Sequence, residues 1–231
     1  MTFLISELAT TLDYAFCLDQ MTPAHLDVAF FGMGCFLNSE PRFGTTKGVW
    51  RTLVGYSGGK YNSPTHDATG DHIETVKIEY DPHSLSYGQL LELFMLWHCP
   101  SQESALPQHA SCVFVKNEFE RRLALAAISR YELCSGDIRQ TQVMPYRTFC
   151  EAEKTCQKYY LRSFPQIIEE IQNYYSDENE LIHSALAARL NGILGYSASS
   201  RALLEDFQFY DLSESIVRAL KCALGGVQGA Q

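Results

Sequence analysis

The sequence has no cluster of basic residues. Among its 231 residues, 18 Lys and Arg are outnumbered by 27 Asp and Glu, and the formal net charge is −9. Nucleic acids and anionic membranes are bound through clustered cations. We therefore expect neither a nucleic acid nor a membrane as a partner.

Long apolar runs are also absent. A transmembrane helix needs about 20 predominantly apolar residues, and a stretch such as residues 90–97 is far shorter. Residues 1–20 contain acidic residues and no basic segment ahead of their apolar positions, so no secretory leader is expected. The sequence thus predicts a cytoplasmic protein.

Paired cysteine motifs are missing as well. The eight cysteines are widely scattered and form no Cys-x-x-Cys pair, which argues against a structural zinc ribbon. There is no internal repeat or low-complexity tract, and 46% of the residues are hydrophobic, as in an ordinary globular chain. The length is sufficient for one well-filled core with an appendage.

Hydrophobic patterning predicts alternating strands and helices, and therefore an α+β fold in which helices pack on a sheet. We expect a lead-in over residues 1–26, the α+β core over 27–165 and a helical extension over 166–231. The elements expected within these segments are strands at 75–80, 111–115 and 140–146, core helices at 86–97 and from 117 to about 133, and extension helices at 166–175, 181–190, 202–207 and 213–223.

Cys35 follows a Gly-rich bend after the apolar run of residues 28–31, where a strand would pass into a helix. A thiol in the first turn of a helix lies near unpaired backbone N–H groups and the positive end of the helix dipole, so its pKa is expected to fall. This placement makes Cys35 a candidate nucleophile. The alternative is a small buried hydrophobic residue, because free cysteine is among the most buried residue types.

Several motifs continue outward from Cys35 in one register. The segment around it reads Gly-Cys-Phe-Leu, with Glu40 three residues after the leucine, and it is followed by Gly-Tyr-Ser-Gly-Gly at 55–59, Thr-Gly-Asp-His-Ile-Glu at 69–74 and the segment 151–161. In these motifs residues 27–165 resemble the A-type peptide methionine sulfoxide reductases. The signature of that family is Gly-Cys-Phe-Trp with a glutamate three residues after the tryptophan.

The resemblance implies the fold of that family, a two-layer sandwich of mixed sheet and packed helices, and the reduction of a peptide methionine (S)-S-oxide or a related sulfoxide. In such a reaction a thiolate attacks sulfur, a proton donor serves the departing oxygen, and a second thiol resolves the sulfenic acid. By resemblance, Cys35 attacks, Glu74 donates the proton, and Phe36 and Leu37 contact the substrate. The alternative for Glu74 is a solvated carboxylate at the end of a strand.

The resemblance also implies turnover by an external reductant, such as a thioredoxin-like protein or a small thiol, without a bound cofactor. The family often carries its resolving cysteines on a mobile C-terminal tail. Cys222 lies beside a Gly-rich C-terminus and is the expected resolving residue. Cys150 and Cys156 flank a segment that matches a helix of the family and are further candidates for this role, but ordinary burial is the expectation for both.

Three positions depart from the family. Leu37 replaces the signature tryptophan, and His66 and His109 stand where the family carries two tyrosines of its substrate site. A neutral imidazole also donates a hydrogen bond, so both histidines are candidate catalytic residues.

Two other functions remain open on these departures. If the fold is kept, Cys35, His66 and His109 face a common cavity near Glu74, and a thiolate with imidazoles is a ligand set for zinc, copper or iron. This set predicts a metalloenzyme that acts on a thiol or another small substrate. The further alternative is a catalytically silent homologue that binds methionine peptides. Against a metal, a lone histidine is more often an ordinary polar or core residue.

Overall fold

The structure is a computed structural model that describes residues 18–60, 63–97, 106–135 and 140–195, together with Arg218 and Leu220. Its strands are β1 (Asp27–Met33), β2 (Val49–Ser57), β3 (Ile73–Tyr80), β4 (Ser111–Val115), β5 (Gln142–Pro145) and β6 (Phe149–Glu151). Its helices are α2 (Phe36–Gly44), α3 (Tyr87–Trp97), the 3-10 helix η1 (Pro107–His109), α4 (Glu118–Ser135), α5 (Tyr159–Arg162), α6 (Pro165–Gln172), α7 (Glu178–Ile182) and α8 (Ala185–Gly195).

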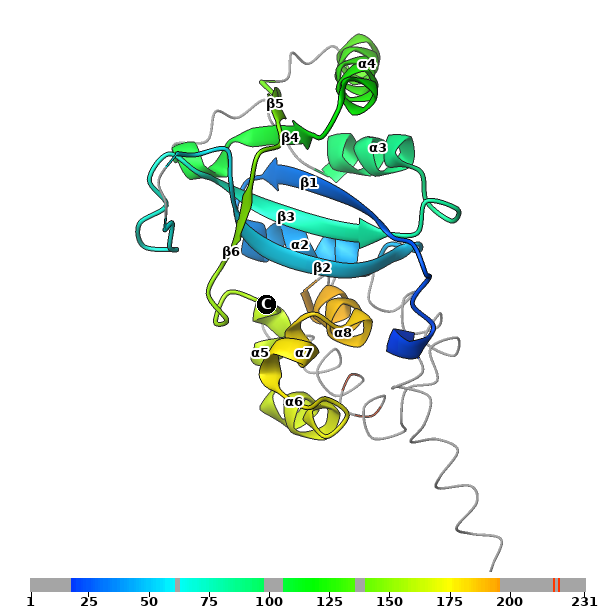
Figure 1. The fold of residues 1–231 in the computed structure, drawn as a ribbon, viewed down its shortest axis with the longest axis vertical. Helices are drawn as coiled ribbons and strands as arrows, with labels where there is room; N and C mark the ends of the chain where they lie inside the picture. Colours follow the sequence, from blue (N-terminus) through cyan, green and yellow to red (C-terminus); the bar gives the residue numbers. More distant parts are fainter. Residues whose placement is uncertain are drawn as a thin grey trace, which may run out of the picture.

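Within the described residues the strands form one sheet in the order β5-β4-β1-β3-β2-β6. Neighbouring strands are antiparallel except for the parallel pair of β4 and β5. In Figure 1, helices α5 to α8 gather beyond β2, whereas α3 and α4 lie on the side of β1 and β4. The predicted α+β fold with a mixed sheet and packed helices is confirmed.

Alternate residues of β3 serve the two faces of the sheet. Val76 and Ile78 belong to the main apolar core, whereas Ile73 belongs to a smaller cluster. Since residues two apart along a strand point the same way, Glu74 lies on the face of the main core. Phe36 of α2 packs into that same core. The register of β3 therefore turns a carboxylate toward the start of α2.

The strands that the sequence predicts at 75–80 and 111–115 are present as β3 and β4, and the third is present as the shorter β5. The strands β2 and β6 are not among those predicted. Residues 52–57 of β2 are all buried, so the sequence shows no alternation of apolar and polar residues there. The three residues of β6 are too few to show a period.

Two core helices begin where their capping residues predict. Ser86 Oγ accepts the N–H of Gln89, and Gln89 Oε1 accepts the N–H of Ser86, which is the reciprocal arrangement of a capping box before α3. Asn117 Oδ1 accepts a backbone N–H of the first turn of α4. None of the helices in the described part of the chain is long and apolar enough to span a bilayer.

The helical extension differs in one respect from its prediction. The helix expected at 181–190 is two helices, α7 and α8, because Ser184 Oγ accepts the N–H of Ala187 at 2.9 Å and so caps α8 separately. The helix expected at 166–175 is present as α6. Those expected at 202–207 and 213–223 lie outside the described residues, apart from Arg218 and Leu220.

Helix α8 packs closely against α2. A Cβ atom on Gly44 would lie 2.3 Å from the carbonyl oxygen of Ala188, and one on Gly192 would lie 2.8 Å from the carbonyl oxygen of Pro41. Neither contact leaves room for a side chain, so the two glycines permit the approach of the helices. Beyond α8, the helices α5 to α7 contribute to a second apolar cluster with members such as Leu161, Ile167, Leu181 and Leu190.

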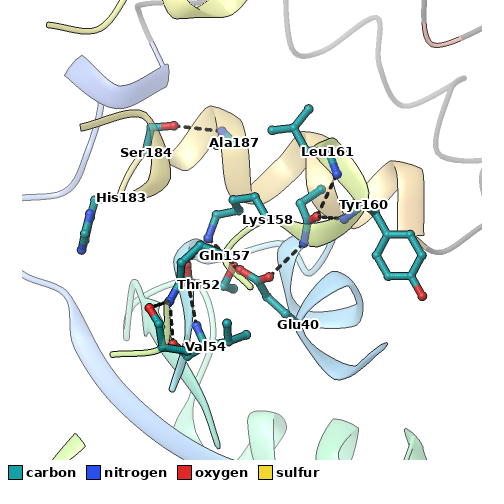
Figure 2. Close-up of polar contacts among 12 residues, drawn as sticks. Glu40, Thr52, Val54, Gln157, Lys158, Tyr160, Leu161, His183, Ser184 and Ala187 are labelled. Carbon is teal, nitrogen blue, oxygen red and sulfur yellow. Dashed lines mark hydrogen bonds and ion pairs between the residues drawn. The ribbon is translucent and has the colours of Figure 1, made fainter. Parts of the chain in front are cut away.

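A buried ion pair joins these helices to the sheet (Figure 2). Lys158 Nζ lies 2.6 Å from Glu40 Oε1, and both side chains are at most 1% exposed. Glu40 Oε1 also accepts the hydroxyl of Thr52 at 2.9 Å, and Oε2 accepts the side-chain amide of Asn191 at 3.0 Å. The carboxylate of Glu40 thus accepts hydrogen bonds from β2 and α8 and also pairs with the ammonium group of Lys158.

The substitution Glu40→Gln is expected to lower the free energy of unfolding by about 3 to 5 kcal/mol, the range typical of breaking one member of a buried pair, because it leaves the Lys158 charge uncompensated. Urea-induced unfolding of the full chain measures the change. The double substitution E40Q/K158M removes both charges and should recover most of the loss.

A surface pair provides the control for this experiment. Arg130 pairs with Glu92 where both side chains are more than half exposed, so Arg130→Ala should leave the urea midpoint nearly unchanged. If E40Q and R130A shift the midpoint equally, the buried pair does not hold the helices as described.

Candidate active site

Cys35 is the N-cap of α2 and is separated from the end of β1 by one residue, between a strand and a helix as its position in the sequence predicts. Gly34 makes the turn with a φ of +83°, a left-handed conformation that glycine adopts without strain. The carbonyl oxygen of Cys35 accepts the N–H of Asn38 at 3.1 Å and of Ser39 at 3.2 Å, which starts the helix. The passage from strand to helix places a partly buried thiol at a helix N-terminus.

Glu74 meets the start of α2 from β3. Its side chain is 1% exposed, which excludes the solvated carboxylate considered from the sequence. Glu74 Oε2 accepts the backbone N–H of Phe36 at 2.9 Å. Glu74 Oε1 lies 3.0 Å from His109 Nε2, at hydrogen-bond distance. The carboxyl group of Glu74 is thereby held on one side by the first turn of α2 and on the other side by the imidazole of His109.

Cys35, Glu74 and His109 form one cluster of reactive groups. One atom of each, the thiol sulfur, a carboxylate oxygen and an imidazole nitrogen, lies within 4.8 Å of the other two. They come from the N-terminus of α2, from β3 and from η1, which are distant in sequence. A thiol beside a carboxyl group and an imidazole is an arrangement suited to nucleophilic attack with proton transfer.

The electrostatics of Cys35 differ from the prediction. Burial disfavours its thiolate, and the negative charge of Glu74 repels it, so the pKa of the thiol lies above its ordinary value. The backbone N–H groups of Leu37 and Asn38 lower the pKa, but their effect is smaller. The fall in pKa predicted from the helix N-terminus is therefore wrong, because the sequence does not show the carboxyl group and the burial that oppose it.

An apolar and aromatic wall adjoins the cluster. The ring of Phe36 lies 5.6 Å from the ring of Tyr56 and 5.9 Å from that of His66, the latter at an interplanar angle of 15°. Glu153 fixes both outer rings, since it accepts the Tyr56 hydroxyl at 3.0 Å and the backbone N–H of His66 at 2.9 Å. Leu37 is partly buried against the main core. Phe36 and Tyr56 are at most 1% exposed, so Leu37 and the exposed His66 are the accessible side chains of this wall.

The structure separates the two histidines that the sequence groups together. His109 reaches Glu74, whereas His66 has an exposed side chain stacked on Phe36 and does not join the cluster of Cys35. Of the three residues predicted as metal ligands, Cys35 and His109 lie together, with Glu74 beside them, and His66 lies outside this group. Cys222, the expected resolving residue, lies outside the described residues.

Two further residues lie near the site, of which Tyr56 is not among those predicted. Tyr56 is buried between Phe36 and Glu153, and its sequence signal is its place in the Gly-Tyr-Ser-Gly-Gly motif. Cys156 is buried, as expected, but it is also close to the site. Its pKa is raised by burial first, then by the charge of Glu153, and to a smaller extent by Glu74 and Cys35. The two cysteines therefore share one electrostatic environment.

Comparisons with known proteins identify relatives of this chain. A family model described as peptide methionine sulfoxide reductase matches residues 27–186. Peptide methionine sulfoxide reductase A5 of Arabidopsis thaliana is 39% identical over 173 residues, which are 72% of this chain and 67% of that protein. Peptide methionine sulfoxide reductase of Drosophila melanogaster is 35% identical over 170 residues, with the same coverage of 72% and 67%. The chain spans about two thirds of the length of these relatives.

Solved structures share the fold. Mxr1 of Saccharomyces cerevisiae in reduced form has a TM-score of 0.56 at 22% identity, covering 62% of this chain and 88% of that one. Methionine sulfoxide reductase A of Corynebacterium diphtheriae has a TM-score of 0.54 at 23% identity, covering 62% and 77%. At these identities the likeness establishes the architecture of the sheet and its helices.

The raised pKa of Cys35 predicts slow alkylation at neutral pH. We expect the rate of its reaction with iodoacetamide to rise with pH to an apparent pKa above that of a free thiol in solution. Glu74→Gln removes a negative charge that opposes the thiolate, so the apparent pKa of Cys35 should fall. Mass spectrometry of the peptide that contains Cys35, quenched at successive times, gives the rate at each pH.

The matched control for this measurement is Glu92→Gln. Glu92 is an exposed carboxylate on α3, and its neutralisation should leave the pH profile of Cys35 unchanged. A profile that is the same in E74Q and wild type would show that the carboxyl group does not act on the thiol.

Proposed function

The chain belongs to the peptide methionine sulfoxide reductase family of oxidoreductases, and on this premise we propose that it reduces the sulfoxide of methionine or of a related thioether with Cys35 as the nucleophile. The observation that carries the proposal is the cluster of Cys35, Glu74 and His109, whose reactive atoms lie within 4.8 Å of one another. The names of the relatives support the class of reaction.

The reaction needs a nucleophilic sulfur and the transfer of one proton from the thiol to the substrate oxygen. The thiolate of Cys35 attacks the sulfoxide sulfur and forms a sulfur–sulfur bond. The oxygen then bonds to the sulfur of Cys35 while the sulfur–oxygen bond of the substrate and the new sulfur–sulfur bond break, which leaves Cys35 as a sulfenic acid. The substrate leaves as the thioether, reduced by two electrons, while Cys35 is oxidised by two. One proton leaves the thiol and one joins the oxygen, so the step balances without another reactant.

Glu74 and His109 are placed to carry that proton. The 3.0 Å between Glu74 Oε1 and His109 Nε2 fits one hydrogen shared by the two atoms. The N–H of Phe36 holds the other oxygen of Glu74 and so fixes the carboxyl group beside the thiol. In this arrangement Glu74 takes the proton from Cys35 and delivers it to the departing oxygen, and His109 positions the carboxyl group.

The substrate is selected by the groups around the thiol. A methyl sulfoxide presents a small apolar group beside a polar oxygen. The apolar group suits Leu37, the accessible neighbour of the buried Phe36, and the oxygen suits the proton shared by Glu74 and His109. These contacts favour a methionine sulfoxide, free or in a peptide, over a charged small molecule.

The sulfenic acid on Cys35 must then be resolved by a thiol, with formation of a disulfide and release of water. The resemblance assigns this step to Cys222. Among the described cysteines, we propose Cys156 as a second candidate, because the charge of Cys35 acts on its pKa and the two thiols are therefore near each other. An external dithiol, such as a thioredoxin-like protein, completes the cycle by reducing the disulfide.

Full-length reduced protein should convert methionine sulfoxide to methionine and oxidise one dithiol per sulfoxide. Cys35→Ser should abolish turnover because the nucleophile is lost, and Glu74→Gln should lower it by about 10²- to 10⁴-fold, the usual contribution of a positioned proton donor. Chromatographic measurement of methionine alongside dithiol consumption gives both rates.

Cys134→Ser is the control for this assay. Cys134 is exposed on α4 and takes no part in the cluster, so the variant should retain wild-type turnover. If the wild type binds methionine sulfoxide peptides without turnover, and C35S binds them equally well, the protein is a binding homologue and the proposed reaction is wrong.

The resolving step is tested with one equivalent of sulfoxide and no reductant. We expect a disulfide between Cys35 and Cys156 in peptide maps, and Cys156→Ser should accumulate a sulfenic acid that dimedone traps on Cys35. In Cys222→Ser the disulfide should form as in wild type. A link from Cys35 to Cys222, with unchanged behaviour of C156S, would assign the step to the C-terminal cysteine instead.

A further inference from the structure

The cluster at the start of α2 combines the side chains that bind borderline-soft divalent cations. Cys35 offers a thiolate, His109 an imidazole nitrogen and Glu74 a carboxylate oxygen, and these three atoms lie within 4.8 Å of one another. Thiolate, imidazole and carboxylate are the ligands found in zinc sites, whereas magnesium and calcium take oxygen ligands alone. The composition of the cluster therefore favours zinc over the hard cations.

We propose that Cys35, Glu74 and His109 bind one zinc ion, with a fourth coordination position open toward solvent. Three protein ligands and one exchangeable position are the usual composition of an open zinc site. Cys35 is partly buried and the His109 side chain is 23% exposed, so an ion has access from outside.

Charge gives the first argument for this site. A thiolate on Cys35 and a carboxylate oxygen of Glu74 would lie within 4.8 Å of each other, so two negative charges would repel each other at short range without a cation. A dication neutralises both negative charges, and a coordinating thiol is deprotonated outright. The interaction that disfavours the thiolate in the metal-free protein is thereby replaced by an attraction.

Geometry gives the second argument. Bond lengths to zinc of about 2.0 to 2.3 Å place ligand atoms roughly 3.3 to 3.8 Å apart around a tetrahedral ion. Glu74 Oε1 and His109 Nε2 are 3.0 Å apart, and the sulfur is within 4.8 Å of a carboxylate oxygen of Glu74 and of a ring nitrogen of His109. A shift of about an ångström, within the range of side-chain rotation, closes the set.

Glu74 is oriented by a neighbouring backbone group before any ion binds. The N–H of Phe36 binds Glu74 Oε2 at 2.9 Å and leaves Oε1 directed toward the cluster. Such contacts behind a ligand orient it and contribute about 10- to 100-fold to metal affinity. His66 cannot replace His109 in this set, because its ring is stacked on Phe36 and its backbone is bound to Glu153.

Zinc at this site would compete with catalysis. A thiolate bound to zinc is no longer a free nucleophile, and Glu74 bound to zinc no longer carries a proton. Zinc is then a reversible inhibitor that protects Cys35 from oxidation and alkylation. This consequence rests on the proposed reductase function, whereas binding of the ion does not.

Binding is measured on the full chain, purified without an affinity metal and freed of metal by a chelator that is then removed. Titration with Zn²⁺ against a chromophoric competitor should give one tight site. Substitution by Co²⁺ should give a sulfur-to-cobalt charge-transfer absorption. Cys35→Ser should remove this absorption, and both C35S and H109Q should weaken zinc binding by more than the roughly 100-fold that is the upper end for a residue behind a ligand.

Two further variants test which histidine binds the ion. His109→Tyr removes the nitrogen ligand but keeps a hydrogen-bond donor next to Glu74, so it should lose zinc affinity about as much as H109Q. His66→Gln removes the histidine that lies outside the set and should retain wild-type affinity. Retention of the cobalt absorption in C35S, or equal losses in H66Q and H109Q, would overturn the site.

The effect on turnover is measured with pre-reduced protein in a single turnover, since added dithiols chelate zinc. One equivalent of Zn²⁺ should suppress the formation of methionine, and a chelator should restore it. In His109→Tyr, whatever its basal rate, the yield should not respond to one equivalent of Zn²⁺. Zinc binding without any sulfoxide reduction would refute only the reductase, and reduction without stoichiometric zinc binding would refute only this inference.

Discussion

The buried ion pair between Glu40 and Lys158 is the interaction on which the position of α2, and hence of Cys35, depends. A charge in the interior costs several kcal/mol unless it is paired and hydrogen-bonded, and Glu40 finds its partners in β2 and α8 as well as in Lys158. The backbone of Lys158 has a φ of 55°, a strained conformation for a residue with a side chain. The strain is tolerated because this conformation brings the ammonium group to the carboxylate. These partners are all satisfied in one arrangement of helix and sheet.

Once α2 is fixed, its N-terminus is shared by two acidic groups. The N–H groups at the start of a helix form an anion site. Here the carboxylate of Glu74 takes the N–H of Phe36, while the next two N–H groups act on the thiol of Cys35. The pKa of the thiol rises because the thiol is buried and, to a smaller extent, because the charge of Glu74 lies beside the same helix end. A proton or a cation between the thiol of Cys35 and the carboxyl group of Glu74 is therefore stabilised by both groups. The same cluster consequently suits both proton transfer and metal binding.

The sequence predicts much of this architecture and little of its electrostatics. Alternation and capping residues are local signals, so β3, β4 and the start of α3 follow from the sequence directly. The position of Cys35 between a strand and a helix follows from its glycines and the apolar run before it. β2 is not predicted because both of its faces are buried, so its sequence does not alternate. The break at Ser184 is not predicted because apolar residues recur at helical spacing on both sides of it. The pKa of Cys35 depends on Glu74, which only the pairing of distant strands brings near.

The two histidines show why residue type alone did not settle the ligand set. His66 and His109 both stand where the resembling family carries a tyrosine, and a tyrosine offers an aromatic ring together with a hydrogen-bonding hydroxyl. In this chain the ring of His66 stacks on Phe36 and so keeps the aromatic property, whereas His109 reaches the carboxyl of Glu74 and keeps the hydrogen-bonding one. Unlike a tyrosine, an imidazole also has a nitrogen lone pair that binds metals. This lone pair is useful only where the nitrogen lies beside other metal ligands. Only at position 109 does it meet the thiol and the carboxylate.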